Sequence, residues 1–293
     1  ILIVLKILIL GSSGLLGRQI YETLKESKNL KLFHSGLKKR KINFENSFEL
    51  KKFIFLKNPD LIINCIAYTN IEDCEKNVKT SKAINVGIVR DIFKIKHQKK
   101  MNFNYIHFST DQFYNSRKNS FSSETSKIFL INKYCKHKRM SEIISLKNKA
   151  LILRINFFGK SISKKQSFSD WIYKAFRNKK KLYLFDDVFF NPLRLKTISK
   201  LIKLIISKNK FNISGIFNLG AKDGIYKNQF SILFAKKTNI YHSNFVNVNV
   251  NKFLKVKRPT NMKMKINKFE KKFGICLPSI RSEIIKEAKE YIS

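Results

Sequence analysis

Cysteine and histidine are scarce in this sequence. Its 293 residues include four cysteines and five histidines. The cysteines (Cys65, Cys74, Cys135 and Cys276) form no C-x-x-C pair, and the histidines do not cluster at a metal-ligand spacing. No histidine has a nucleophilic partner at a spacing typical of catalysis. We therefore expect no bound metal and a reducing, cytoplasmic compartment.

Long hydrophobic runs are missing as well. The apolar opening, Ile1 to Leu10, is interrupted by Lys6, whereas a transmembrane helix needs about 20 apolar residues. A signal-peptide core is the competing interpretation, but no small-residue cleavage site follows. We expect no membrane span and assign the segment to a first strand. The hydrophobic fraction of 43% suffices for one large α/β domain, alone or with a small lobe.

Acidic residues are few, with 20 Asp and Glu against 60 Lys and Arg, and the formal charge is +40. Such a charge attracts any polyanion. The lysines are nevertheless scattered over nearly every segment, and they accompany Ile, Asn and Phe, which share A/T-rich codons. This pattern favours compositional drift over dedicated nucleic-acid binding. The basic runs at residues 38–41 and 179–181 are interpreted as solvated loops, and we expect no specific nucleic-acid partner.

Apolar runs alternate with amphipathic stretches through the first half of the chain, without an internal repeat or a long linker. This alternation is typical of βαβ units and a parallel sheet. Beyond about residue 160 the pattern is less regular, which indicates a lobe over the carboxyl ends of the strands. Strands are expected near residues 7–10, 30–34, 61–65, 102–109, 150–155, 182–185 and 216–219, and helices at 14–27, 48–55 and around residues 134–138.

A glycine-rich turn, Gly11-Ser12-Ser13-Gly14-Leu15-Leu16-Gly17, directly follows the first apolar run. A glycine turn between a strand and a helix lets the backbone approach a pyrophosphate, whose charge then lies at the helix N-terminus. The spacing departs from G-x-G-x-x-G, and an ordinary strand-to-helix turn is the alternative. Its place at the start of a βαβ series favours dinucleotide binding. The expected cofactor contacts here are Gly11, Ser13, Gly14, Leu15, Leu16 and Gly17.

An acidic residue is absent where NAD-binding proteins usually hold the ribose 2′-hydroxyl, at the end of the second strand. The chain reads His34-Ser35-Gly36-Leu37-Lys38-Lys39-Arg40 there, a basic cluster suited to a 2′-phosphate. This favours NADPH as the cofactor, with NADH as the alternative.

Tyr134 and Lys138 lie one helical turn apart, so their side chains share a helix face. An unperturbed tyrosine has a pKa of about 10, and a nearby ammonium lowers it. Tyr134 is then suited to donate a proton to a developing alkoxide. The alternative is a surface helix on which the two residues are merely neighbours.

Ser109-Thr110-Asp111 ends the fourth expected strand. A hydroxyl at this edge of the sheet can hydrogen-bond the carbonyl oxygen that Tyr134 protonates. These residue types also favour plain turns, which is the alternative.

Taken together, the motifs resemble the extended short-chain dehydrogenase/reductases, and within them the dTDP-4-dehydrorhamnose reductase family. The resemblance covers nearly the whole chain. It rests on the glycine turn, Asn64-Cys65-Ile66-Ala67-Tyr68-Thr69, Phe108-Ser109-Thr110-Asp111, Tyr134-Cys135-Lys136-His137-Lys138 with Ser141-Glu142, Leu153-Arg154, Asn218-Leu219-Gly220 and Arg258-Pro259.

The resemblance implies specific roles for the matching residues. Thr110, Tyr134 and Lys138 would form the catalytic set, with Tyr134 and Lys138 also contacting the cofactor. Thr110 and Arg258 would contact the substrate. The segment that would line the cofactor is Cys65, Ile66, Ala67 and Tyr68.

The implied fold is α/β, a doubly wound, Rossmann-like parallel sheet with a smaller C-terminal α/β substrate lobe. Residues 1–160 would form the dinucleotide-binding domain, and residues 161–293 mainly the substrate-binding lobe, interleaved with the first. The implied reaction is NADPH-dependent reduction of a 4-keto nucleotide-sugar in deoxysugar and polysaccharide biosynthesis, and the assembly is compatible with a homodimer.

Two features depart from the family pattern. Cys65 and Ile66 stand where small residues are usual, and Gln112 follows Thr110-Asp111 where related dehydratases carry a glutamate base. An amide cannot abstract a proton, which disfavours the dehydratase interpretation. Two alternatives stay open: another sugar-nucleotide epimerase or reductase, and a non-catalytic dinucleotide-binding subunit resembling the regulatory subunit of methionine adenosyltransferase.

Overall fold

The computed structural model describes residues 4–35, 46–117 and 120–292. The basic cluster at Lys38-Lys39-Arg40, on which the preference for NADPH rests, lies outside these residues.

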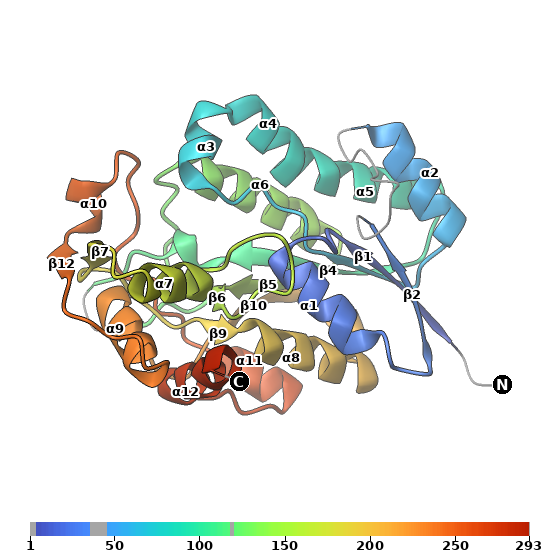
Figure 1. Ribbon diagram of the computed structural model, residues 1–293. Coiled ribbons are helices and arrows are strands. Elements are labelled where there is room, and N and C mark those ends of the chain that lie inside the picture. Colours follow the sequence, from blue (N-terminus) through green and yellow to red (C-terminus); the bar gives the residue numbers. More distant parts are fainter. Residues whose placement is uncertain (1–3, 36–45, 118–119, 293) are drawn as a thin grey trace. The chain divides into compact units, whose positions relative to one another are not determined.

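A six-stranded sheet in the order β10-β5-β4-β3-β1-β2 forms the centre of the fold (Figure 1). Strands β1 and β2, β1 and β3, and β3 and β4 pair in parallel, with Ile7 opposite Leu61 and Ile63 opposite Ile106. Residues 7–10 and 61–63 are fully buried on both faces of the sheet, which explains their continuous apolar runs. The strands are β1 (Leu5–Leu10), β2 (Leu30–His34), β3 (Leu61–Asn64), β4 (Asn104–Thr110), β5 (Leu151–Ile155) and β10 (Gly215–Leu219).

Helices cover both faces of this sheet. Figure 1 shows α2, α5 and α6 on one side and α1 and α8 on the other. The Thr23 hydroxyl donates to Ser199 Oγ at 2.8 Å, which joins α1 to α8. This confirms the doubly wound α/β fold expected from the sequence. The helices are α1 (Leu15–Leu24), α2 (Ser47–Lys57), α3 (Ile71–Lys76), α4 (Val78–Lys82), the π-helix η1 (Ala83–Gly87), α5 (Ile88–Gln98), α6 (Lys133–Lys147), α8 (Leu195–Ser207) and the 3-10 helix η3 (Lys210–Asn212).

The chain divides into two compact units whose segments interleave. Unit 1 comprises residues 1–109, 133–153 and 198–216, and unit 2 comprises residues 110–132, 154–197 and 217–293. The strand expected at residues 216–219 is present as β10. It pairs beside β5 in the central sheet, not among the short strands of the expected lobe, and Gly215 N–H donates to the Ala150 carbonyl at 3.0 Å.

Unit 2 is built on short strands and a phenylalanine-rich core. Phe158 and Phe230 meet edge to face, with ring centroids 4.8 Å apart. The paired strands are β7 (Leu182–Phe185) with β12 (Phe245–Val248), β8 (Phe189–Phe190) with β11 (Ile225–Tyr226), and β6 (Phe157–Phe158) with β9 (Leu193–Arg194). The helices are the 3-10 helix η2 (Asp111–Phe113), α7 (Phe168–Arg177), α9 (Lys227–Lys237), α10 (Val250–Phe253), α11 (Asn267–Phe273) and α12 (Ile280–Ile292).

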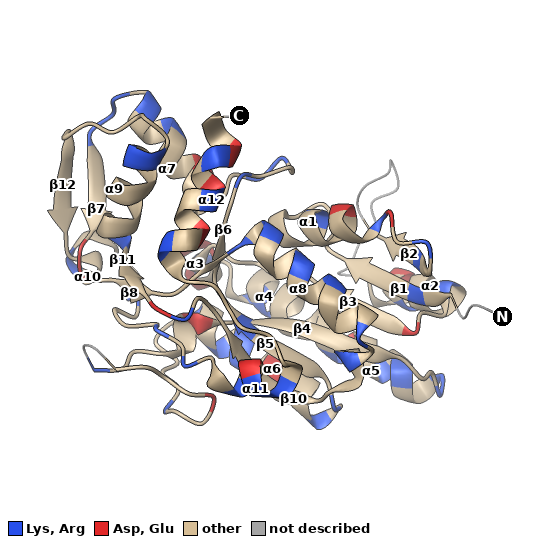
Figure 2. Ribbon diagram, turned by 90° about the horizontal axis from the view of Figure 1, so that it is seen from below, with Lys and Arg blue, Asp and Glu red and all other residues tan. Residues whose placement is uncertain are grey.

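Acidic residues of α12 hold a buried arginine in unit 2. The Arg194 backbone N–H donates to Glu283 at 2.8 Å, and its guanidinium pairs with Glu287 at 2.5 Å and Glu290 at 3.3 Å. These glutamates, at spacings of four and three residues, share one face of the helix. Figure 2 shows Lys and Arg on helices throughout the chain, whereas α12 carries several of its few acidic residues. Three of the scarce acidic residues therefore surround one buried cation.

The described helices and acidic, cysteine and histidine side chains bear on membranes and metals. Among the described residues, every helix falls short of the length and apolar character that crossing a bilayer requires. Within the same ranges, no group of three or more His, Cys, Asp or Glu side chains is placed to hold a metal ion.

Candidate active site

The glycine turn joins β1 to α1 in a way that side chains would block. Gly11 has φ +78°, in the left-handed region, and a Cβ there would lie 2.9 Å from the Cys65 carbonyl carbon and the Ile66 nitrogen. A Cβ on Gly17 would collide with the Gly11 carbonyl oxygen. Glycine at these two positions thus allows the turn to pack against the segment after β3 and to close tightly on the first turn of α1.

The N-terminus of α1 is suited to an anion. Gly14 is the N-cap, with no side-chain capping bond, and the first turn carries no acidic residue. The N–H groups at such a helix end attract negative charge. Ser12 is buried and its hydroxyl donates to the Ser35 carbonyl, whereas Ser13 is exposed at the turn. Of the two serines, Ser13 is therefore the one whose side chain can reach a ligand.

The segment after β3 packs against this turn, and a residue of the π-helix η1 hydrogen-bonds to its backbone. Residues 65–68 are half-buried. Asn85 in η1 accepts from the Tyr68 N–H at 2.9 Å and donates to the Tyr68 carbonyl at 3.0 Å. Isolated π-turns often occur at functional sites. Sequence reasoning missed Asn85, because a single π-turn leaves no periodic signal.

Tyr134 and Lys138 are both buried on α6, with 8% and 3% of their surface exposed. The Lys138 ammonium donates to the Phe108 carbonyl of β4 at 2.6 Å. Burial lowers the pKa of Lys138 to about 8, and the charge of Glu142 counteracts this. Burial also raises the pKa of the Cys65 thiol, so the thiol is neutral. Unit 1 thus brings together α6, the end of β4 and the segment after β3, and the two residues do not lie on an exposed helix face.

In the Ser-Thr-Asp segment at the end of β4, the Ser109 and Thr110 hydroxyls make different hydrogen bonds. Ser109 Oγ donates to Glu142 Oε2 at 2.9 Å, so its hydroxyl is engaged within unit 1. Thr110 Oγ1 accepts from the Gln112 N–H at 3.1 Å and caps η2, which leaves the hydroxyl proton to be donated elsewhere. Thr110 therefore both ends the strand as a turn residue and keeps a donor.

Asp111 begins η2 and is buried in unit 2. Burial raises the pKa of its carboxyl to about 6, while a 2.6 Å bond from Asn156 Nδ2 and the charge of Lys227 oppose the rise. Burial lowers the pKa of Lys227, which also interacts electrostatically with Arg258 and Asp187. Lys227 was not among the predicted site residues, because nothing in its local sequence distinguishes it from the other lysines.

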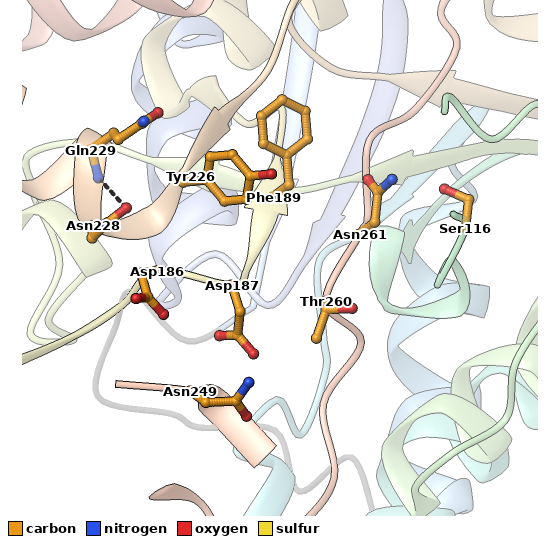
Figure 3. Close-up of a pocket in the computed structure, with 10 residues that line it drawn as sticks. All are labelled: Ser116, Asp186, Asp187, Phe189, Tyr226, Asn228, Gln229, Asn249, Thr260 and Asn261. Carbon is orange, nitrogen blue, oxygen red and sulfur yellow. Dashed lines mark hydrogen bonds between the residues drawn. The ribbon is translucent and has the colours of Figure 1, made fainter. Parts of the chain in front are cut away.

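Unit 2 contains a pocket of about 680 Å³, within the size range of small-molecule sites. Figure 3 shows Asp187 and Asn249 directed toward the same space. Phe189 and Tyr226 meet edge to face beside it, with centroids 4.8 Å apart. Carboxylates, amides and aromatic rings together suit a ligand with many hydroxyl groups. The lining residues are Ser116, Asp186, Asp187, Phe189, Tyr226, Asn228, Gln229, Asn249, Thr260 and Asn261.

Arg258 lies in unit 2, two residues before Thr260 of the pocket lining. Its backbone N–H donates to Asn251 Oδ1 at 2.8 Å, and its guanidinium to the Val256 carbonyl at 3.2 Å. The predicted site residues thus fall into two groups. The glycine turn, residues 65–68, Tyr134 and Lys138 belong to unit 1, and Thr110 and Arg258 to unit 2.

Comparisons with known proteins extend over both units. Residues 5–292 match the family model described as RmlD substrate binding domain. The probable low-salt glycan biosynthesis reductase Agl14 of Haloferax volcanii is 24% identical over 232 residues, covering 75% of this chain and 76% of that protein.

Solved structures share the fold. A dTDP-4-dehydrorhamnose reductase from Clostridium acetobutylicum superposes with a TM-score of 0.86 at 19% identity, covering 98% of this chain and 99% of that one. The dTDP-4-dehydrorhamnose reductase from Bacillus anthracis, solved in complex with NADP, gives a TM-score of 0.85 at 19% identity, with 97% and 99% covered.

Proposed function

This chain belongs to the RmlD substrate binding domain family, and we propose that it is an NADPH-dependent reductase of a 4-keto nucleotide-sugar in glycan or polysaccharide biosynthesis. The observation that carries the proposal is the buried Tyr134 and Lys138 pair on α6, with Lys138 bonded to the end of β4 in the same unit as the glycine turn. The reductase named in Haloferax volcanii supports the reaction class.

The residues present fit a dinucleotide. The uncapped N-terminus of α1 and the N–H groups of the glycine turn would receive the pyrophosphate. Cys65, Ile66, Ala67 and Tyr68 would line the cofactor, and Lys138 would contact its nicotinamide ribose. The NADP complex of the Bacillus anthracis structure supports NADPH over NADH. We assign this binding mainly to residues 1–160 and substrate binding mainly to residues 161–293.

The chain's own residues would manage the proton. Bound NADPH supplies the hydride for the keto carbon. The Tyr134 hydroxyl donates its proton to the oxygen that becomes an alkoxide, and the Lys138 ammonium stabilises the phenolate left behind. Thr110, whose hydroxyl proton is not used in capping η2, donates a hydrogen bond to the same oxygen.

The pocket of unit 2 is proposed as the nucleotide-sugar site. Its carboxylate and amide groups suit sugar hydroxyls, and Arg258 would contact the phosphates. The test is an NADPH oxidation assay on a panel of dTDP-linked and other nucleotide-linked 4-keto sugars, repeated with NADH. We expect turnover of at least one sugar, faster with NADPH. Absence of turnover on every sugar, together with co-purification of a partner enzyme, would instead indicate a non-catalytic regulatory subunit.

A further inference from the structure

We propose that Glu142 is a positioning residue, whose buried carboxylate keeps Lys138 in its charged form and fixes the end of β4 against α6. This inference rests on the proposed reductase function, because it concerns the lysine assigned to the reaction. It adds a third, buried residue to the Tyr134 and Lys138 pair.

Within unit 1, Glu142 links α6, which carries Lys138, to the end of β4. It lies four residues after Lys138, one helical turn further along the same face of α6. The side chain of Glu142 is fully buried. Its Oε2 accepts from Ser109 Oγ at 2.9 Å, and its Oε1 from the Arg139 guanidinium at 3.1 Å. One carboxylate thus joins the helix that carries Lys138 to the residue preceding Thr110.

Two further contacts join α6 to the residues of β4 that precede Ser109. Ser141 Oγ lies 3.3 Å from His107 Nε2, and the Phe108 carbonyl accepts from Lys138. Three successive residues, His107, Phe108 and Ser109, therefore each contact α6. A strand held at three consecutive residues has little freedom to shift along the helix. The residue directly before Thr110 is therefore held in place on α6.

The charges around Lys138 show why a carboxylate is needed. Ionisable groups whose charges couple to Lys138 include Cys65 from the segment after β3, His107 from β4 and Glu142 from α6. Tyr134 lies one turn earlier on the same helix. Burial and the Lys138 charge hold the pKa of His107 well below its usual range, and burial raises the pKa of Cys65, so both are neutral near pH 7. Glu142 supplies the negative charge, and Arg139, its other partner, is a second cation. Removing the carboxylate would take away a negative charge that compensates the buried Lys138 ammonium, which is costly. Arg139 itself is partly exposed, with 29% of its side chain accessible.

The test measures the Lys138 titration directly, without a substrate. Lysine labelled with ¹³C is followed by NMR against pH, and the Lys138 signal is assigned by its absence from Lys138→Met. In Glu142→Gln we expect the Lys138 midpoint to fall by about one pH unit, because an opposite charge has been removed. Glu142→Asp, which retains the charge, should recover part of the shift. Glu22→Gln, which removes a carboxylate from the surface ion pairs of α1, should leave the midpoint unchanged.

An unmoved Lys138 midpoint in folded Glu142→Gln overturns the inference. If Glu142→Gln does not fold, the double variant Lys138→Met/Glu142→Gln decides, because removing both charges should restore folding if they compensate each other. A double variant that is no more stable than Glu142→Gln contradicts the pairing.

Kinetics then test the link to the reaction. The alkaline limb of the kcat profile should move down in Glu142→Gln in parallel with the NMR midpoint, with the KM for NADPH little changed. A moved midpoint with an unmoved profile overturns the catalytic part of the inference. If the wild-type protein has no turnover, the reductase proposal fails, whereas the lysine titration still decides whether Glu142 controls the charge of Lys138.

Discussion

Lys138 in unit 1 and Arg194 in unit 2 are both buried cations, with 3% and 8% of their surface exposed, but they are held differently. Arg194 donates from its backbone and guanidinium to three glutamates of α12. The Lys138 ammonium donates to the Phe108 carbonyl, and burial lowers its pKa to about 8. One neutral carbonyl and the single carboxylate of Glu142 compensate the Lys138 charge less completely than three carboxylates compensate Arg194.

The difference separates two uses of buried charge. The Arg194 network joins β9 to α12 and stabilises the fold of unit 2. Lys138 instead keeps a pKa within reach of physiological pH, which is typical of groups at functional sites. Substitution of each cation should reveal this contrast.

Lys138→Met should abolish most turnover and leave the protein folded. Removing the cation that stabilises the tyrosine phenolate should lower kcat by about 10²- to 10⁴-fold, the range typical of proton-transfer catalysis. Folding should be unimpaired, because the Glu142 carboxylate keeps its bonds from Ser109 and Arg139. An incompletely compensated buried charge is replaced by an apolar side chain of similar length. Steady-state kinetics and chemical denaturation measure the two effects. A variant that is unfolded at room temperature would assign Lys138 to structure.

Arg194→Met should show the opposite pattern. The glutamates that pair with Arg194 would lose their cation, and breaking a buried pair typically costs about 3 to 5 kcal/mol of unfolding free energy. Denaturation with urea measures the loss, and NADPH affinity of the protein that stays folded serves as the control, because the proposed cofactor residues belong to unit 1. A loss below about 1 kcal/mol, the value of surface pairs, would remove the contrast with Lys138.

Gly17→Ala tests the packing of the glycine turn. The added Cβ would collide with the Gly11 carbonyl oxygen, and such overpacking costs about 1 to 3 kcal/mol. We expect lower stability and weaker NADPH binding, measured by denaturation and by fluorescence titration. Gly87→Ala is a matched control, since the atoms nearest to its Cβ lie at 3.9 and 4.0 Å, ordinary contact distances. Equal effects of the two substitutions would show that replacing any glycine by alanine lowers stability and NADPH binding, and that the packing of the turn is not the cause.

The pH dependence of turnover and of stability has a defined sign. The folded pKa of Lys138, about 8, lies below the ordinary value of 10.5. Turnover should therefore fall about tenfold per pH unit above pH 8, as the ammonium is lost. Between pH 8 and 10.5 the unfolded chain binds the proton that the folded chain has released, so this group makes stability rise with pH. Wild-type unfolding free energy minus that of Lys138→Met isolates the lysine, and a falling difference would contradict the assignment.

The sequence predicts the central sheet well where both faces are buried. Continuous apolar runs such as residues 61–63 identify strands directly. The strand at residues 216–219 was also expected, but not its place beside β5, because a local pattern does not specify which strand it pairs with. The division of the chain into interleaved units is likewise set by long-range contacts.

For the candidate site too, the sequence predicts local features but not long-range contacts. The spacing of Tyr134 and Lys138 is local, and one helix places both residues on one face. The contact between Ser109 and Glu142 joins residues 33 positions apart, so the sequence offers Glu142 as part of a motif without a role. The pocket of unit 2 draws its lining from several distant segments and has no sequence signature.

The most direct measurement is NADPH oxidation by wild-type protein and Tyr134→Phe on the nucleotide-linked 4-keto sugar that gives the highest rate. We expect turnover by the wild type and a loss of about 10²-fold or more in Tyr134→Phe, with NADPH binding nearly unchanged. Undiminished turnover by Tyr134→Phe would contradict the proposed role of the phenol.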